Sequence, residues 1–95
     1  MLTQERLKTV LDYNKQTGVF TWRSRKKSEK YFNSRFSGKR AGYLMRGYVR
    51  ITIDGIGYDA HRLAFLYVDG AFPVNHVDHI NHDPSDNKWL NLRHA

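Results

Sequence analysis

The chain has 95 residues, a formal net charge of +7 and no cysteine. This length predicts one small domain over residues 1–95, near the size at which a single hydrophobic core is only just sufficient. The absence of cysteine excludes a disulfide framework and cysteine-ligated zinc, which suits a reducing cytoplasm. No apolar run is long enough for a membrane helix, and the first residues lack the apolar core of a signal peptide. We therefore expect a cytoplasmic protein without membrane contact.

The charge is distributed unevenly along the chain. Residues 1–50 carry 13 Lys and Arg against 3 Asp and Glu, a net charge of +10. Residues 51–95 carry 3 against 6, a net charge of −3. A basic half attracts a polyanion and an acidic half can hold a cation, which is the combination that a metal-dependent nuclease needs. The alternative is a basic surface that only keeps the protein soluble.

The chain begins with a predicted helix over residues 4–13. Thr3 is a suitable N-cap, and the apolar residues that follow it recur at helical spacing, namely Leu7, Val10 and Leu11. Residues 14–18 are typical of a turn, and the β-branched and aromatic residues 19–22 predict a strand. We expect this opening to be structural packing.

Residues 23–40 are the most basic part of the chain and follow neither a helical nor a strand period, so we expect an extended arm. Its basic residues are Arg23, Arg25, Lys26, Lys27, Lys30, Arg35, Lys39 and Arg40. Aromatic residues are interleaved with them at Tyr31, Phe32 and Phe36. Such arms bind DNA phosphates, and their aromatic side chains stack on bases. The alternative is a surface loop whose aromatic side chains pack back onto the domain.

A hairpin is predicted over residues 43–58 and a helix over residues 60–69. Apolar and polar residues alternate in residues 48–53, and Asp54-Gly55 is a strong turn signal. Gly70 stands where a helix commonly ends in a left-handed conformation. His61 is expected on the opposite or a flanking face of this helix from its apolar residues, as a buried hydrogen-bonding group rather than a catalyst.

The most informative segment is residues 77–93, which contains two histidines, three aspartates and three asparagines. Val77 and Ile80 frame Asp78-His79, as in a short strand, and residues 83–86 are typical of a tight loop. The alternation in residues 90–93 predicts a second strand. Asp78 and His79 are adjacent on a strand, so their side chains should point to opposite sides.

These residues resemble the HNH endonuclease family, of the type found in phage genomes and intron-encoded nicking enzymes. The resemblance rests on Asp78-His79-Ile80-Asn81, Asp86-Asn87 and Asn91-Leu92-Arg93, with support from residues 47–51, 54–55 and 60–65. It implies an α+β fold: an N-terminal helix, a hairpin, a helix and a C-terminal ββα-metal motif. We divide the domain into a basic region (1–40), the hairpin with its helix (41–72) and the motif (73–95).

The resemblance also implies roles for individual residues. Asp78 would be a ligand of Mg²⁺ or Mn²⁺, and His79 would be the general base that takes a proton from water. Asn91 would be a catalytic asparagine that either pins the loop backbone or fixes the imidazole tautomer, and Asn87 a structural residue that ties the loop closed. Further contacts with double-stranded DNA are expected from Arg62, Lys88 and Arg93.

One part of the family pattern is not met. A helix with a further metal ligand, an Asn or a His, is expected about nine positions after Asn91. We therefore expect that the chain ends before this helix, and that His94 or a second chain completes the metal site if it is complete. His82 stands where relatives often have glycine and is expected to be an exposed loop residue.

Two other interpretations remain open. The first is a non-catalytic DNA-binding module that keeps the basic half without a working metal site. The second is a structural zinc domain that uses His76, His79, His82 and His94, whose spacing is suggestive although a strand would not point the first three together. No small-molecule substrate is expected, and a phage-encoded protein of this kind would act in the host cytoplasm.

Overall fold

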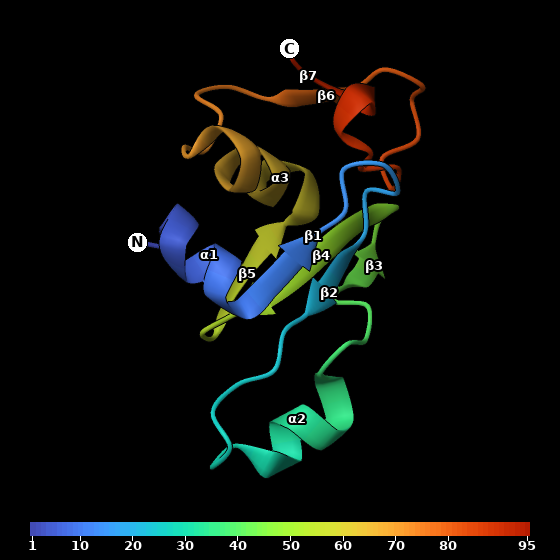
Figure 1. The fold of residues 1–95 in the computed structure, drawn as a ribbon. Helices are drawn as coiled ribbons and strands as arrows, with labels where there is room; N and C mark the ends of the chain where they lie inside the picture. Colours follow the sequence, from blue (N-terminus) through green and yellow to red (C-terminus); the bar gives the residue numbers. More distant parts are fainter.

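A computed structural model describes all 95 residues. Its elements in chain order are α1 (Gln4–Val10), β1 (Leu11–Tyr13), β2 (Phe20–Trp22), α2 (Lys30–Phe36), β3 (Tyr43–Met45), β4 (Tyr48–Ile53), β5 (Ile56–Asp59), α3 (Ala60–Asp69), β6 (Val77–His79), a 3₁₀ turn (Trp89–Asn91) and β7 (Leu92–His94). The predicted α+β class is confirmed. The molecule is elongated, with extents of 42 × 23 × 23 Å, and α2 lies at the opposite end from the β6–β7 motif (Figure 1).

The strands form three separate antiparallel sheets, ordered β1-β2, β3-β4-β5 and β6-β7. The predicted hairpin is confirmed for β4 and β5, which pair Ile53 with Ile56 across the turn at Asp54-Gly55. β3 adds a third strand through a second two-residue turn at Arg46-Gly47. Both residues of each turn have positive φ, as the right-handed twist of hairpin strands favours.

The core lies where α1 and α3 pack together and α3 covers β4 and β5. Its largest fully buried side chains come from these elements and from β1: Leu7, Leu11, Ile51, Ile53 and Leu63. The α3 helix has the predicted bounds and ends at Gly70 with φ 83°. None of the helices is long and apolar enough to cross a membrane.

The predicted helix over residues 4–13 is wrong at its end. Helix α1 stops at Val10, and residues 11–13 form β1, which pairs Leu11 with Trp22. The strand buries Leu11 and Tyr13 while Asp12 stays exposed, so two apolar side chains reach the core in strand alternation. This tertiary pairing outweighs the local helical spacing.

The arm without regular structure is also wrong in part, because residues 30–36 form α2. Phe32 and Phe36 are four residues apart on this helix, with ring centroids 5.1 Å apart, and Phe32 packs edge-on against Trp22. Side-chain pairs at this spacing stabilise a helix. The helix buries no residue, so it stands away from the core.

Candidate functional site

The site begins with the pairing of β6 and β7, which sets Asp78 opposite Arg93 and His79 opposite Leu92. Adjacent residues on a strand point to opposite faces. His79 accordingly turns inward and is only 7% exposed, while the Asp78 side chain is 43% exposed. The two residues of the motif therefore work in different environments.

The His79 imidazole is held by Asn87. Its Nε2 lies 2.9 Å from Asn87 Oδ1, and Asn87 is itself buried. Because an amide oxygen only accepts, Nε2 donates the proton and Nδ1 keeps a lone pair. Asn87 is the one hydrogen-bond partner of the ring within the protein, and His79 lines a cavity of about 230 Å³ together with Tyr48, Asp78 and His82. The imidazole is thus oriented with one nitrogen free to accept a proton.

Asn91 pins the loop between the two strands. Its Nδ2 donates to Asn81 Oδ1 at 3.0 Å and to the Asp86 carbonyl at 2.8 Å, and its Oδ1 accepts from Asn81 N at 3.0 Å. In the structure Asn91 therefore pins the loop backbone and does not contact the imidazole. The contact that orients the imidazole belongs instead to Asn87, which was expected only to tie the loop closed.

The tip of the loop is also internally hydrogen-bonded. Ser85 donates to Asp83 Oδ1 through its backbone N and its hydroxyl, at 3.0 and 2.7 Å. These two bonds, the side-chain bond first, lower the pKa of Asp83 below its usual value. His82 is exposed, as expected, with φ 63°.

Asp78 is paired with Arg93. The guanidinium donates to Asp78 Oδ2 through Nε at 3.2 Å and through Nη2 at 3.0 Å. Nowhere do three His, Cys, Asp or Glu side chains gather as a metal site would require. A hard cation such as Mg²⁺ takes about six oxygen ligands. One carboxylate with an arginine partner does not supply this set, so the residues present do not fit a divalent ion by themselves.

The zinc interpretation is contradicted by the same geometry. His79 is buried, His82 is exposed, and the His94 ring packs on Phe65 at 4.6 Å between centroids. The predicted set with His76 is therefore not brought together. Side chains on successive strand and loop positions diverge, which is why the spacing alone misleads.

His61 is a candidate that the sequence did not place in the site. It lies in the first turn of α3 and is 8% exposed, with its ring centroid 5.1 Å from that of His79. Burial is the main cause that lowers its pKa to about 4, against the opposing effect of Asp59. The expectation that His61 hydrogen-bonds in the interior is wrong, because its Nδ1 has no partner.

Tyr48 joins the two histidines. Its ring centroid lies 5.6 Å from that of His61 and 6.1 Å from that of His79. The three side chains come from β4, α3 and β6, so the cluster forms only when these elements pack. No local sequence pattern indicates it, since Tyr48 lies in an alternating strand and His61 in an amphipathic helix.

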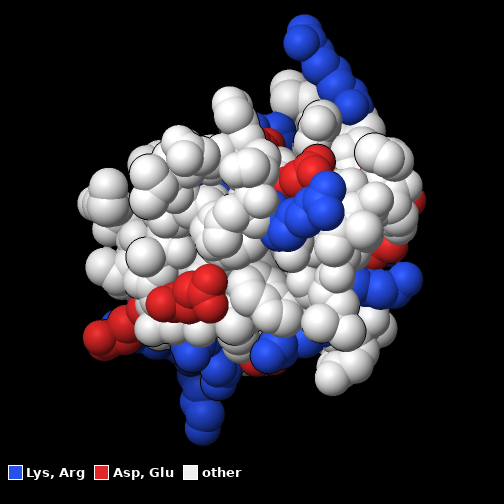
Figure 2. Space-filling view, turned by 90° about the horizontal axis from the view of Figure 1, so that it is seen from above, with Lys and Arg blue, Asp and Glu red and all other residues white.

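The residues expected to contact DNA fall into two groups. Most of the basic arm lies at the α2 end of the molecule, away from β6 and β7 (Figure 1). Arg62, Lys88 and Arg93 lie with the motif: Arg62 donates to the Pro73 and Asn75 carbonyls at 3.4 Å, and Lys88 lies 3.6 Å from Asp86. Seen from above, basic and acidic groups are interspersed among uncharged ones on that face (Figure 2).

The site thus consists of an antiparallel ββ motif with a buried, oriented histidine in a small α+β domain. Residues 58–95, which include α3, β6 and β7, match the family model described as HNH endonuclease. The resemblance inferred from the motifs is confirmed over these residues. Proteins of this family are nucleases that act on DNA and generally use a divalent metal ion, so nuclease-type function is indicated at the level of the family. No curated protein and no solved structure matches the chain.

Proposed function

We propose that the protein is a DNA endonuclease, of the phage or intron-encoded type, that hydrolyses phosphodiester bonds of double-stranded DNA with His79 as the general base. The observation that carries the proposal is the contact of His79 Nε2 with Asn87 Oδ1 beside a cavity, which in the neutral ring leaves the lone pair on Nδ1. A neutral imidazole near pH 7 is suited to take a proton from water. The resulting hydroxide attacks phosphorus, the bond to the 3′ oxygen breaks, and this oxygen takes up a proton from water, which yields a 3′ hydroxyl and a 5′ phosphate.

Asn87 and Asn91 act as positioning residues in this proposal. Asn87 fixes the tautomer of His79, and Asn91 holds the loop that carries Asn87 through its bond to the Asp86 carbonyl. Groups that orient a catalytic side chain affect the rate without touching the substrate. Both should therefore change cleavage more than they change DNA binding.

Asp78 is the one carboxylate that lines the His79 cavity, and this position supports its expected part in binding Mg²⁺ or Mn²⁺. Its partner Arg93 and the lack of further carboxylates do not fit a complete metal site. The same two observations favour a second candidate function, a DNA-binding module without catalysis. The two functions differ in whether His79 matters once DNA is bound.

A plasmid assay separates the two candidates. Supercoiled DNA is incubated with the 95-residue protein and with His79→Ala, in Mg²⁺, in Mn²⁺ and in EDTA, while duplex binding is measured in parallel. An endonuclease should lose about 10²–10⁴-fold in rate with His79→Ala, the usual contribution of a positioned base, and keep its DNA affinity. DNA binding without cleavage in any metal, unchanged by His79→Ala, would contradict the endonuclease and leave the binding module.

A further inference from the structure

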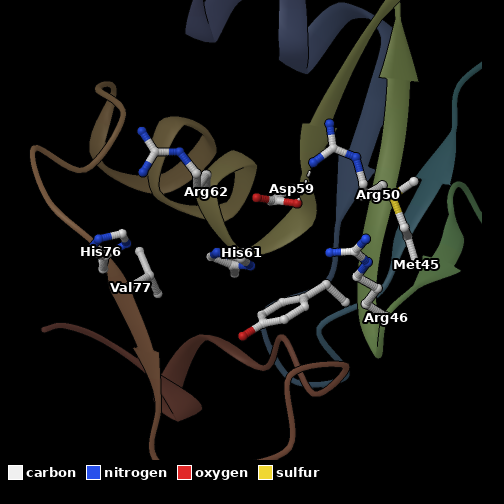
Figure 3. A pocket seen from close by; sticks show the side chains of 9 residues that line it. Met45, Arg46, Arg50, Asp59, His61, Arg62, His76 and Val77 are labelled. Atoms are coloured by element: carbon white, nitrogen blue, oxygen red, sulfur yellow. Dashed lines mark hydrogen bonds and ion pairs between the residues drawn. The ribbon is translucent and has the colours of Figure 1, made fainter.

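A second cavity lies beside His79. It is an open cavity of about 420 Å³, bordered by the β3–β4 turn, the start of α3 and the segment that enters β6. Basic residues from each of these parts line it, and Asp59 is the one acid among them (Figure 3). These basic residues are Arg46, Arg50, Arg62, His61 and His76.

The positive charge of this cavity is only partly neutralised. Arg50 Nη1 lies 2.8 Å from Asp59 Oδ1, which offsets one of the three guanidinium groups. Arg62 donates to backbone carbonyls alone, at 3.4 Å, and so keeps its full charge. Arg46 makes no hydrogen bond or ion pair within the protein and is exposed. Two uncompensated cations in one concave site attract an anion.

Arg46 also occupies an unfavourable backbone position. Its φ is 53° in a two-residue turn where Asn, Asp and Gly are the usual residues. The equivalent position of the next hairpin is Asp54, with φ 52°. An arginine held in this conformation costs some stability, and the turn aims it at the cavity. This places a free guanidinium at the cavity mouth (Figure 3).

His61 supplies a polar group in the wall. It is more than nine-tenths buried, and neither ring nitrogen makes a hydrogen bond within the protein. A buried imidazole without a partner is costly unless something completes its hydrogen bonding. An oxygen of an anion in this cavity can accept a bond from the neutral ring.

We propose that this cavity binds a backbone phosphate of DNA next to the phosphate that His79 attacks. Arg46 and Arg62 supply the charge, His61 supplies a hydrogen bond, and the His61–His79 ring separation of 5.1 Å places the two phosphates side by side. Arginine is suited to this task because its planar fork matches phosphate oxygens. The inference rests on the proposed function for the identity of the ligand as DNA.

The first test uses the intact protein and inorganic phosphate. Imidazole signals of His61 and guanidinium signals of Arg46 are followed by NMR during addition of phosphate, with chloride at equal ionic strength as the control. Phosphate should shift both sets of signals and chloride should not. Equal responses to the two salts would overturn the phosphate site.

The second test removes the free charge without harming the turn. Arg46→Asn places a residue that favours positive φ at this position, so the fold should be retained. Affinity for a 20-base-pair duplex should fall about tenfold, as for the loss of a charge-assisted phosphate contact, and the salt dependence should weaken by about one phosphate. Lys8→Gln, an equal loss of charge on α1, should change affinity less than about twofold.

The outcomes separate this inference from the proposed function. If Arg46→Asn binds duplex as Lys8→Gln does, the phosphate site is wrong, whether or not the protein cuts DNA. If Arg46→Asn loses affinity while the wild-type protein never cuts, the phosphate site stands and the endonuclease falls. The binding measurements do not depend on the metal, because they are made in EDTA.

Discussion

Two loops at opposite ends of the molecule, one before α2 and one between β6 and β7, are each closed by the side chain of one asparagine. Asn33 in α2 accepts from Arg25 N at 2.7 Å and donates to the Arg25 and Lys26 carbonyls at 3.0 and 3.2 Å. Asn91 likewise makes three hydrogen bonds, to Asn81 and Asp86. Each asparagine thus brackets its loop with one acceptor bond and two donor bonds. The local chemistry of the two loops is alike.

What lies behind the loops differs. Helix α2 buries no residue. The motif loop is backed by the domain, where the Tyr13 hydroxyl donates to the Asn87 carbonyl at 2.5 Å. Gly18 is so close that a Cβ there would lie 2.3 Å from the Asn87 carbonyl carbon, which only glycine permits. The same set of asparagine hydrogen bonds therefore holds a fixed site in the motif loop, which the core supports. In the loop before α2, which has no core behind it, the result is an adaptable arm.

Among variants of the two loops, Asn91→Ala has the largest expected effect. The variant loses all three bracket bonds, so Asn87 and His79 are no longer held in register. Cleavage should fall about 10–100-fold, as for other residues that orient a catalytic side chain, with duplex affinity unchanged. Rates at saturating DNA and binding in EDTA measure the two effects. Equal losses of cleavage and affinity would mean that the loop binds DNA rather than orienting His79.

The second prediction concerns the pH dependence of stability, which we expect to come from His61 near the motif and not from the arm. Burial holds the pKa of His61 at about 4, below 6.5 for an exposed histidine. Below pH 6.5 this histidine is therefore protonated in the unfolded chain but stays neutral in the folded protein. The free energy of unfolding falls as the pH approaches 4. The neighbouring charges act in both directions, since Asp59 favours protonation while His79 and Arg62 oppose it.

Between pH 7 and pH 5 this group should cost about 2 kcal/mol of unfolding free energy. Urea unfolding in chloride buffers at both pH values measures it, with His61→Gln as the control because it removes the titrating ring. The wild-type protein should lose more stability on acidification than the variant. The same loss in both proteins would show that His61 is not the group responsible.

The contrast between the loops also explains what the sequence could and could not predict. The β4–β5 hairpin, α3 and the pairing of β6 with a second strand follow from local patterns: alternation, a turn dipeptide and a glycine at a helix end. The strand predicted over residues 90–93 is wrong at its start, because Trp89–Asn91 form a 3₁₀ turn and β7 begins at Leu92. Strand β1 was missed because its pairing with β2, further along the chain, outweighs the local helical spacing. Helix α2 was missed because Phe32 and Phe36 are a single pair at helical spacing, without a longer helical period around them.

The candidate site divides in the same way. The sequence indicated Asp78, His79 and Asn91 because they belong to a motif with fixed order. It did not indicate His61, whose ring approaches that of His79 only in the folded protein, because the two residues lie 18 positions apart on α3 and β6. The sequence left open whether Asn91 pins the loop or orients His79, since the path of the loop depends on turns such as His82 with φ 63°.

The third prediction concerns Asn33→Ala, the substitution in the arm that corresponds to Asn91→Ala in the motif loop. The three bonds to Arg25 and Lys26 are lost, and α2 has no buried residue to hold it in place. Ordering the arm on DNA then costs more, so duplex affinity should fall several-fold. Cleavage at saturating DNA should stay at the wild-type rate, the reverse of Asn91→Ala. Loss of cleavage at saturation would show that the arm shapes the site.

The smallest expected effect is that of one arm cation, Lys27→Gln. Lys27 is exposed and makes no ion pair within the protein, so its charge is free for a phosphate. Each phosphate contact releases counterions, and its loss should reduce the slope of log affinity against log salt by about 0.9. Affinity should fall only about two- to threefold at physiological salt, where screening is strong. Titrations of one duplex at several salt concentrations measure both.

Because an adaptable arm can engage phosphate with its neighbouring cations, the slope is the more sensitive quantity. An unchanged slope would place Lys27 outside the interface, and a flat salt response of the wild-type protein would remove the whole arm from it.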